Sequence, residues 1–338
     1  MERKLQARAK INLGLDVLRR RPDGYHDLRM VMQTVNLCDE ISLRVLENEP
    51  GIRLIVRSGE FVEVSDMANL RGSADSSVHI ESLVPADSRN LAYRAAQLLM
   101  EEFENRQGLE IILEKRIPVA AGLAGGSSDA AAVLIGTNEL FELGLSKEEL
   151  MERGVKLGAD IPYCILRGTA LAEGIGERLT PLPQAPEAFV LLAKPPVAVS
   201  TKYVYTHLDM EAFSCSSLTA DDADRSEDVS VSEGLMKTAS VGITHPDIDA
   251  QVRAIREGDL YRMAALMGNV LESVTVPGYP VIGEIKKQMM QLGAVNAMMS
   301  GSGPTVFGLF DDRGRAENAY EELCRGTLAN EVFLTTFF

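Results

Sequence analysis

A glycine-rich segment in the middle of the chain contains residue types that bind an anion. Residues 122–128, GLAGGSS, combine three glycines with two serines, and an alanine-rich segment that favours a helix follows directly. Glycine lets the backbone approach a ligand closely, and a helix start offers unpaired N–H groups at the positive end of its dipole. This order predicts a phosphate site. The alternative interpretation is a flexible turn in which a serine or Asp129 only caps the helix.

Two further sets of polar residues could take part in chemistry on a phosphate. Lys10 and Asn12 stand two residues apart in an apolar segment, so a strand would place both on one face. Asp160 follows the helices predicted behind the glycine-rich segment, and a carboxylate can accept the proton of a hydroxyl group. The alternatives are a solvated strand face for Lys10 and Asn12, and a structural salt bridge between Lys10 and Asp160.

A strand is predicted to present Lys10 and Asn12. In residues 5–17 every odd position is apolar and the even positions are polar or glycine, which is typical of a strand with one buried face. Residues 21–26, RPDGYH, carry a strong turn signature. A second strand over about residues 28–45 would complete a hairpin.

Two helices are predicted to position the glycine-rich segment and Asp160. The first follows that segment and can end at Gly144, and the second runs over residues 146–158 and begins with a capping box. Pro162 disfavours helical geometry for the residue before it, so Asp160 is expected at an irregular junction. We expect residues 161–177 to form two strands joined by glycine turns.

The remaining elements suggest two domains. Three prolines in residues 181–186 predict a linker, which divides the chain into domains of residues 1–184 and 185–338. The Ser- and Asp-rich parts of residues 47–88 and 211–237 are predicted to be loops, the former with a short strand. Elsewhere we expect helices over residues 90–104, 245–258, 259–274 and 281–293, and strands over residues 109–113, 189–193 and 295–299.

Composition excludes several functional classes. The 338 residues carry a formal charge of −15, which argues against nucleic acid or an anionic membrane as a partner. No apolar run approaches the roughly 18–20 residues that span a bilayer, and the first residues lack the apolar core of a signal peptide. The cysteines and histidines are scattered, which predicts reduced thiols and no metal site built from side chains. We expect a cytoplasmic protein that is a monomer or a weak homodimer.

Five short motifs occur in the order found in one superfamily of kinases. They are AKINL at residues 9–13, PDGYH at 22–26, GLAGGSSD at 122–129, GADIP at 158–162 and GSGP at 301–304. The chain resembles the GHMP kinases, named after galactokinase, homoserine kinase, mevalonate kinase and phosphomevalonate kinase, and within them the diphosphocytidyl methylerythritol kinases. The resemblance covers most of the chain apart from about residues 57–88 and 211–243.

The resemblance implies a two-domain α+β fold with the active site in the cleft between the domains. The N-terminal domain would be like domain 2 of ribosomal protein S5, and the C-terminal domain would be a ferredoxin-like α/β sandwich. Lys10 and Asp160 would act where the phosphoryl group is transferred, with Asp160 as the base.

The other implied roles concern binding. The substrate would contact Asn12, Tyr25, His26, Thr201 and Tyr205, with Tyr203 as the alternative to Tyr205 beside the cytosine. ATP would contact Pro118, Val119, Ala120, Ala121, Gly122, Leu123, Ala124, Gly125, Gly126, Ser127, Ser128, Asn90 and Lys115. Gly301, Ser302 and Gly303 would close over the phosphates.

The implied reaction is phosphorylation of the C2 hydroxyl of 4-diphosphocytidyl-2-C-methyl-D-erythritol by ATP and Mg²⁺, in the non-mevalonate route to isoprenoid precursors. Phosphate oxygens and Ser127 or Ser128 would hold Mg²⁺. Ala124 replaces a glycine that is common in the family, and the role of Asp129 is open. A kinase of another alcohol, such as mevalonate or homoserine, and a regulator that binds nucleotide without catalysis are the competing hypotheses.

Overall fold

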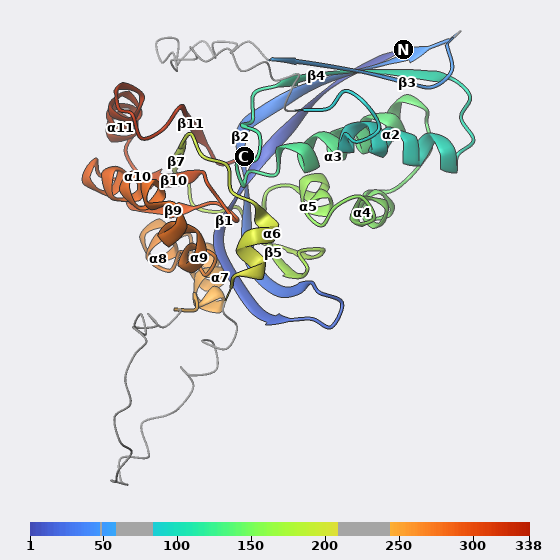
Figure 1. Ribbon diagram of the computed structural model, residues 1–338. Coiled ribbons are helices and arrows are strands. Elements are labelled where there is room, and N and C mark those ends of the chain that lie inside the picture. The colour runs from blue at the N-terminus through green and yellow to red at the C-terminus, as the bar shows by residue number, and fades with distance from the viewer. Residues whose placement is uncertain (48, 59–83, 209–243) are drawn as a thin grey trace, which may run out of the picture.

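The computed structural model describes residues 1–47, 49–58, 84–208 and 244–338 (Figure 1). Most of the two Ser- and Asp-rich segments predicted to be loops, together with Cys215, lies outside these residues. The short strand expected in the first of these segments is present as β3 (Ile52–Ser58), which runs parallel to β4 (Gly108–Lys115).

A long antiparallel hairpin forms the centre of the first sheet. Its strands pair over most of their length, and the sheet order is β3-β4-β2-β1-β8, with β5 pairing to β2 and β6 pairing to β5. The strands are β1 (Glu2–Arg20), β2 (His26–Leu46), β3 (Ile52–Ser58), β4 (Gly108–Lys115), β5 (Thr169–Gly174), β6 (Arg178–Pro181) and β8 (Gly268–Asn269). The predicted hairpin is therefore confirmed, with longer strands than the pattern indicated.

Strand β1 is buried on both faces, which the alternating pattern did not predict. Every residue from 9 to 17 is buried, including Lys10 and Asn12. Ala9 and Ile11 pack into a core shared with the C-terminal part of the chain, while helix α3 (Gly125–Leu140) packs on β1 and β2. The expectation of one solvated face is thus wrong, because segments distant in sequence cover it. The pairing of β1 with β2 shifts register on each side of Lys10 and Asn12.

Four helices lie together on one side of the long hairpin (Figure 1). They are α2 (Leu91–Glu102), α3, α4 (Lys147–Val155) and α5 (Ile161–Leu166). The Asn90 side chain caps α2 by accepting from the Ala92 N–H, and Ser146 with Glu149 forms the predicted capping box of α4. Residues 161–166 are helical and not a strand. The reason is that Pro162 stands in the first turn, where its missing N–H would have no acceptor within the helix.

The second sheet has the strand order β11-β7-β10-β9 and is antiparallel throughout. Helices α10 and α11 connect into it and pack on it, which gives the ferredoxin-like arrangement expected. Its elements are β7 (Phe189–Lys194), α10 (Pro280–Gln291), β9 (Asn296–Met299), β10 (Val306–Phe310), α11 (Arg313–Arg325) and β11 (Glu331–Thr336). Residues 182–188 form neither helix nor strand, and this supports our proposal that the two domains divide at residues 184 and 185.

The helix predicted over residues 259–274 is interrupted. Three elements occupy this region: α8 (Leu260–Ala265), the short strand β8, and α9 (Glu272–Gly278). Strand β8 pairs in parallel with β1 at Gly14 and Leu15, so pairing with a strand from the first domain overrides the local helical preference. Helices α6 (Thr201–Thr206) and α7 (Ile248–Glu257) precede this region in the C-terminal part of the chain.

Two findings concern the chain as a whole. None of the helices in the described ranges has the length and apolar character that crossing a bilayer would require. Cys38, Cys164 and Cys324 are thiols that form no disulfide.

A buried charged cluster supports the start of α3. The Lys115 ammonium donates to Asp129 Oδ2 at 2.8 Å and to Asp39 Oδ2, and all three side chains are almost fully buried. Asp39 also accepts from the backbone N–H groups of Arg116 and Ile117. We call Lys115, Asp39 and Asp129 the Lys115 cluster; it joins β2, β4 and α3.

The Lys115 cluster holds one ammonium between two carboxyl groups. Burial raises the pKa of Asp129 well above its usual range; Lys115 opposes this effect and the charge of Asp39 adds to it. Asp129 Oδ1 has no hydrogen-bond partner within the described structure. We infer that Asp129 carries the proton that balances the charge of the cluster.

We expect Asp129→Asn to stabilise the protein increasingly as pH rises. The folded protein keeps a proton on Asp129 that the unfolded chain, with an ordinary pKa of about 3.9, has released. Its stability therefore falls as pH rises above that value, and the neutral amide removes this loss. In thermal unfolding between pH 4 and 8, the melting temperature of Asp129→Asn relative to that of the wild type should rise as pH increases.

Asp39→Asn is the contrasting variant. It removes the carboxylate that Lys115 and two backbone N–H groups share, so a loss of about 3–5 kcal/mol is expected at neutral pH. If Asp129→Asn instead loses stability in step with rising pH, Asp129 is the ionised member.

Candidate active site

A cavity of about 690 Å³ lies between the first domain and the loops of the second. Most of the residues predicted to bind or react line it, and they come from both domains. From that set the cavity is lined by Lys10, Asn12, Tyr25, Asn90, Lys115, Pro118, Val119, Ala120, Ala121, Gly122, Ala124, Gly125, Gly126, Ser127, Asp160, Thr201, Tyr205, Gly301 and Ser302. His26, Leu123, Ser128 and Gly303 belong to the predicted set but are not among the lining residues.

Lys10 carries a buried positive charge with a neutral partner. Its side chain is 5% exposed, and Nζ donates to Asn12 Oδ1 at 2.7 Å. Among the residues that the structure describes, no ion pair joins Lys10 to a carboxylate, so the salt bridge with Asp160 considered above is absent. Burying an unpaired charge is costly, and an anion at this position would offset that cost. The geometry therefore suits a phosphate.

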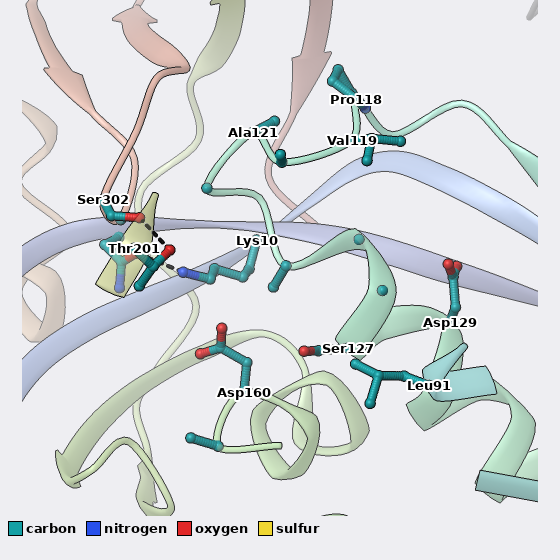
Figure 2. Close-up of a pocket in the computed structure, with 18 of the residues that line it drawn as sticks. Lys10, Leu91, Pro118, Val119, Ala121, Ser127, Asp129, Asp160, Thr201 and Ser302 are labelled. Carbon is teal, nitrogen blue, oxygen red and sulfur yellow. Dashed lines mark hydrogen bonds between the residues drawn. The ribbon is translucent and has the colours of Figure 1, made fainter. Parts of the chain in front are cut away.

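Asp160 occupies the residue before α5, but its side chain does not cap that helix. In Figure 2 its carboxylate points toward the side of the cavity on which Lys10 lies. Burial raises the pKa of Tyr205, and the negative charge of Asp160 raises it further. The same two causes act on the thiol of Cys164, whose pKa is raised as well. Asp160 is thus a carboxylate available to a ligand in the cavity.

The glycine-rich segment is locked against the loop that precedes β10. Gly122 has a φ of +74°, and a Cβ there would lie 2.3 Å from the carbonyl oxygen of Ser300. Ser300 Oγ in turn donates to the Gly122 carbonyl at 2.9 Å. Only glycine allows this approach, which joins the two predicted phosphate-binding loops. Ala124 takes a left-handed conformation at φ 56°, which explains why a glycine would also suit that position.

The two serines at the start of α3 have different environments. Ser128 is buried and donates to the Arg8 carbonyl at 2.6 Å, so it ties α3 to β1. Ser127 lines the cavity, and Figure 2 shows its hydroxyl on the same side as Asp160. Of the two alternatives for a metal ligand, the geometry favours Ser127.

Two tyrosines line the cavity, and a histidine packs against one of them. The rings of His26 and Tyr205 are 5.2 Å apart at 34°, and Tyr25 is 59% exposed at the cavity rim. Tyr203 instead stacks on His207 with ring centroids 3.9 Å apart and does not line the cavity. Of the two alternative tyrosines, only Tyr205 lines the cavity. Burial lowers the pKa of His26, and the nearby charge of Arg20 lowers it further.

The cavity is also lined by residues that sequence reasoning missed. Val84, Pro85, Arg89 and Leu91 line it together with Pro118 and Val119. The asparagine between them, Asn90, uses its amide to cap α2 and to donate to the Pro85 carbonyl at 2.8 Å. The only sequence signal was the Asn-Leu pair, because Val84 and Pro85 border a segment without regular periodicity.

Thr201 and Ser302 meet at the mouth of the cavity. Their hydroxyl groups are 2.8 Å apart, shown as a dashed line in Figure 2. This contact joins the start of α6 to residues 301–303, which we call the Gly-Ser-Gly loop. A ligand between Lys10 and Asp160 would therefore be enclosed by the glycine-rich segment on one side and by this pair on another.

The cavity also suits a magnesium ion carried by a phosphate ligand. Mg²⁺ is usually bound through one or two protein oxygens together with substrate phosphates and water. In the described part of the chain there is no group of three His, Cys, Asp or Glu side chains that would form a separate metal cage. Ser127 Oγ nevertheless presents an oxygen atom in the cavity.

Comparison with known proteins gives a consistent result. The model of the GHMP kinases N terminal domain matches residues 90–168, and the model for GHMP kinases C terminal matches residues 251–327. The glycine-rich segment and Asp160 fall in the first match, and the Gly-Ser-Gly loop in the second.

Full-length relatives carry one name. The 4-diphosphocytidyl-2-C-methyl-D-erythritol kinase of Lachnoclostridium phytofermentans is 46% identical over 99% of this chain and 97% of its own. That of Lachnospira eligens is 47% identical over 99% of this chain and 98% of its own. A crystal structure of 4-(cytidine 5'-diphospho)-2C-methyl-D-erythritol kinase matches with a TM-score of 0.70 and 29% identity, over 100% of this chain and 99% of that one. The chain therefore belongs to the GHMP kinases and, within them, to the family of 4-diphosphocytidyl-2-C-methyl-D-erythritol kinases.

Proposed function

We propose that the protein transfers the γ-phosphoryl group of ATP to the C2 hydroxyl of 4-diphosphocytidyl-2-C-methyl-D-erythritol, giving the 2-phosphate and ADP. The observation that carries the proposal is that Lys10 and Asp160 line one cavity between a glycine-rich helix start and a set of aromatic side chains. Such a cavity has separate places for a triphosphate and for a nucleobase-bearing alcohol. The names of the close relatives agree with this substrate.

ATP binds with its triphosphate along the glycine-rich segment. The N–H groups at the start of α3 and the positive end of its dipole face this part of the cavity and favour a phosphate. The adenine fits the apolar end formed by Val84, Pro85 and Leu91. Lys115 does not contact the phosphates as a mobile cation, because Asp39 and Asp129 already hold its ammonium. It supports the floor of the site, 3.3 Å from where a Cβ on Gly125 would lie.

The acceptor alcohol binds with its cytosine between the aromatic side chains of Tyr25 and Tyr205. Tyrosine rings stack well on a base because every base has a π-face. Asn12 and Thr201 line the path from this end to Lys10, so they are placed to contact the polyol.

Phosphoryl transfer requires mainly positioning and charge compensation. The Asp160 carboxylate takes the proton of the C2 hydroxyl as its oxygen bonds to the γ-phosphorus, and the bond to the β-phosphate oxygen breaks to release ADP. The Lys10 ammonium compensates negative charge on the transferred group, and its bond to Asn12 fixes its direction. When bound, Mg²⁺ would neutralise phosphate charge, held by phosphate oxygens and by Ser127.

The proposal is tested by measuring ADP release with ATP and Mg²⁺ and one of four acceptors. The acceptors are 4-diphosphocytidyl-2-C-methyl-D-erythritol, mevalonate, homoserine and none. Turnover with the cytidyl substrate alone is expected. Selective turnover of another alcohol would show a kinase with a different substrate from the one proposed. Nucleotide binding without turnover of any acceptor would favour the regulator that binds nucleotide without catalysis.

Asp160→Asn should lower kcat by about 10²–10⁴-fold, which is the usual contribution of a positioned general base. Its thermal stability should stay close to that of the wild type, because the side chain makes no capping bond. Asp247→Asn is the matched control: Asp247 also precedes a helix, but it caps α7 and lies outside the cavity. The control should keep its kcat, and near wild-type turnover by Asp160→Asn would remove the base assignment.

Tyr205→Ala should raise the KM for the cytidyl substrate by about 5- to 100-fold, the range expected for losing one base–aromatic stack. The KM for ATP should change little, since the adenine lies at the other end of the cavity. Tyr203→Ala serves as the comparison, because Tyr203 is 49% exposed and stacks on His207 instead. The measurement is the steady-state KM of both variants for the cytidyl substrate. A larger increase in Tyr203→Ala than in Tyr205→Ala would assign the cytosine stack to Tyr203.

A further inference from the structure

Asn269 makes three hydrogen bonds that no predicted role explains. Its Nδ2 donates to the carbonyl of Met299 at 2.9 Å and to that of Gly301 at 2.8 Å. Its Oδ1 accepts from the Leu271 N–H at 3.0 Å. The side chain is 7% exposed, so these contacts are shielded from water. One buried amide thus holds both ends of the turn into the Gly-Ser-Gly loop.

Two neighbouring side chains bind the same loop. Glu272 Oε1 accepts from the Met299 N–H at 2.8 Å, and its other oxygen pairs with Lys286 at 2.6 Å. Thr275 Oγ1 donates to the Ser302 carbonyl at 3.4 Å. Asn269 and Glu272 therefore fix Met299 through its carbonyl and its N–H respectively. The loop is held by side chains of the segment from β8 to α9 as well as by its own strands.

The backbone of this segment is attached to the strand that carries Lys10. Strand β8 pairs with β1 at Gly14 and Leu15, and the Val270 N–H donates to the Leu15 carbonyl at 3.1 Å. On the loop side, a Cβ at Gly301 would lie only 3.6 Å from Asn12 Oδ1. Asn269 thus stands between β1 and the Gly-Ser-Gly loop and bonds across the gap.

We propose that Asn269 is a positioning residue for phosphoryl transfer: it sets the place of the Gly-Ser-Gly loop relative to Lys10 and Asn12. The inference rests on the proposed function for the reaction that it serves. Without the amide, the carbonyl oxygens of Met299 and Gly301 lose their donor and turn toward other partners, because buried acceptors require one. The loop then shifts, and Ser302 no longer lies over the phosphates. Misplacement of such a group by about 1 Å can cost on the order of 10²-fold in rate.

The test compares Asn269→Ala and Asn269→Asp with a matched asparagine. Asn296 lies at the other end of β9, and its Nδ2 donates to a backbone carbonyl, that of Ala264, at 2.6 Å. It is not among the residues that line the cavity. Asn296→Ala therefore removes a similar bond from the same strand without affecting the loop.

Asn269→Ala should lower kcat/KM for ATP by about 30- to 100-fold, with the KM for the alcohol within about 3-fold of the wild type. Asn269→Asp should lose more, since a carboxylate faces two carbonyl oxygens. Asn296→Ala should lose a comparable amount of thermal stability but keep both kinetic constants within about 2-fold. Equal kinetics for Asn269→Ala and Asn296→Ala at equal folded fraction would overturn the inference.

Calorimetric binding of Mg·ADP separates this inference from the proposed function. If the wild type turns over none of the acceptors, the proposed function fails. In that case, weaker ADP binding by Asn269→Ala than by Asn296→Ala still supports the role of Asn269 in positioning the loop. If the wild type turns over the cytidyl substrate and Asn269→Ala matches it, only the positioning role fails.

A second pair of variants covers the case in which the Asn269 variants do not fold. Glu272→Gln keeps the acceptor for the Met299 N–H, and Glu272→Ala does not. If kcat/KM for ATP falls by at least about 10-fold in Glu272→Ala but not in Glu272→Gln, with the KM for the alcohol unchanged, the segment has a positioning role. Equal kcat/KM values for ATP in the two variants overturn this role.

Discussion

A positive charge buried on a central strand is the constraint on which the active site depends. Lys10 is 5% exposed on β1, and within the described residues its ammonium donates to the amide oxygen of Asn12. A buried ammonium without a carboxylate is costly, so the surrounding structure has to hold it in place by other means. Pairing with β2, shifted in register on either side of Lys10 and Asn12, and packing on both faces of β1 supply that restraint. The fold thus maintains an unneutralised cation at the place where a phosphate would bind.

The two loops that meet at this cation are mutually dependent. The Gly122 carbonyl accepts from Ser300 Oγ, and the close approach of the two backbones leaves no room for a side chain on Gly122. The Lys10 N–H donates to the Leu123 carbonyl, so the glycine-rich segment is also attached to β1. Consequently the first domain positions the helix start, the second domain positions the Gly-Ser-Gly loop, and the contact between Gly122 and Ser300 joins the two. A cavity between domains is the direct result of this arrangement.

Local pattern predicted the elements well where local forces determine them. The strand around Lys10, the hairpin turn, the Asn90 cap and the capping box at Ser146 were all predictable, since periodicity and capping chemistry act over a few residues. The burial of Lys10 and Asn12 was not, because helices and a core from distant segments cover β1. The break at Asn269 was missed for the same reason: residues 259–274 have a helical pattern, but pairing with β1 interrupts it. Family resemblance supplied the residues proposed to bind cytosine. Only the coordinates show that Tyr205 and Ser127 line the cavity and that Tyr203 and Ser128 do not.

The contrast between two buried lysines shows how surroundings assign different tasks to one residue type. Both Lys10 and Lys115 are 5% exposed and line the same cavity. Lys115 is paired with Asp39 and Asp129, so its charge is compensated within the protein. Its role is to join β2, β4 and α3. Lys10 has an amide for a partner, and its charge remains available to a ligand. An incoming phosphate would therefore gain more from approaching Lys10 than Lys115. This difference agrees with our proposal that the γ-phosphate lies between Lys10 and Asp160, above a floor that is electrically balanced.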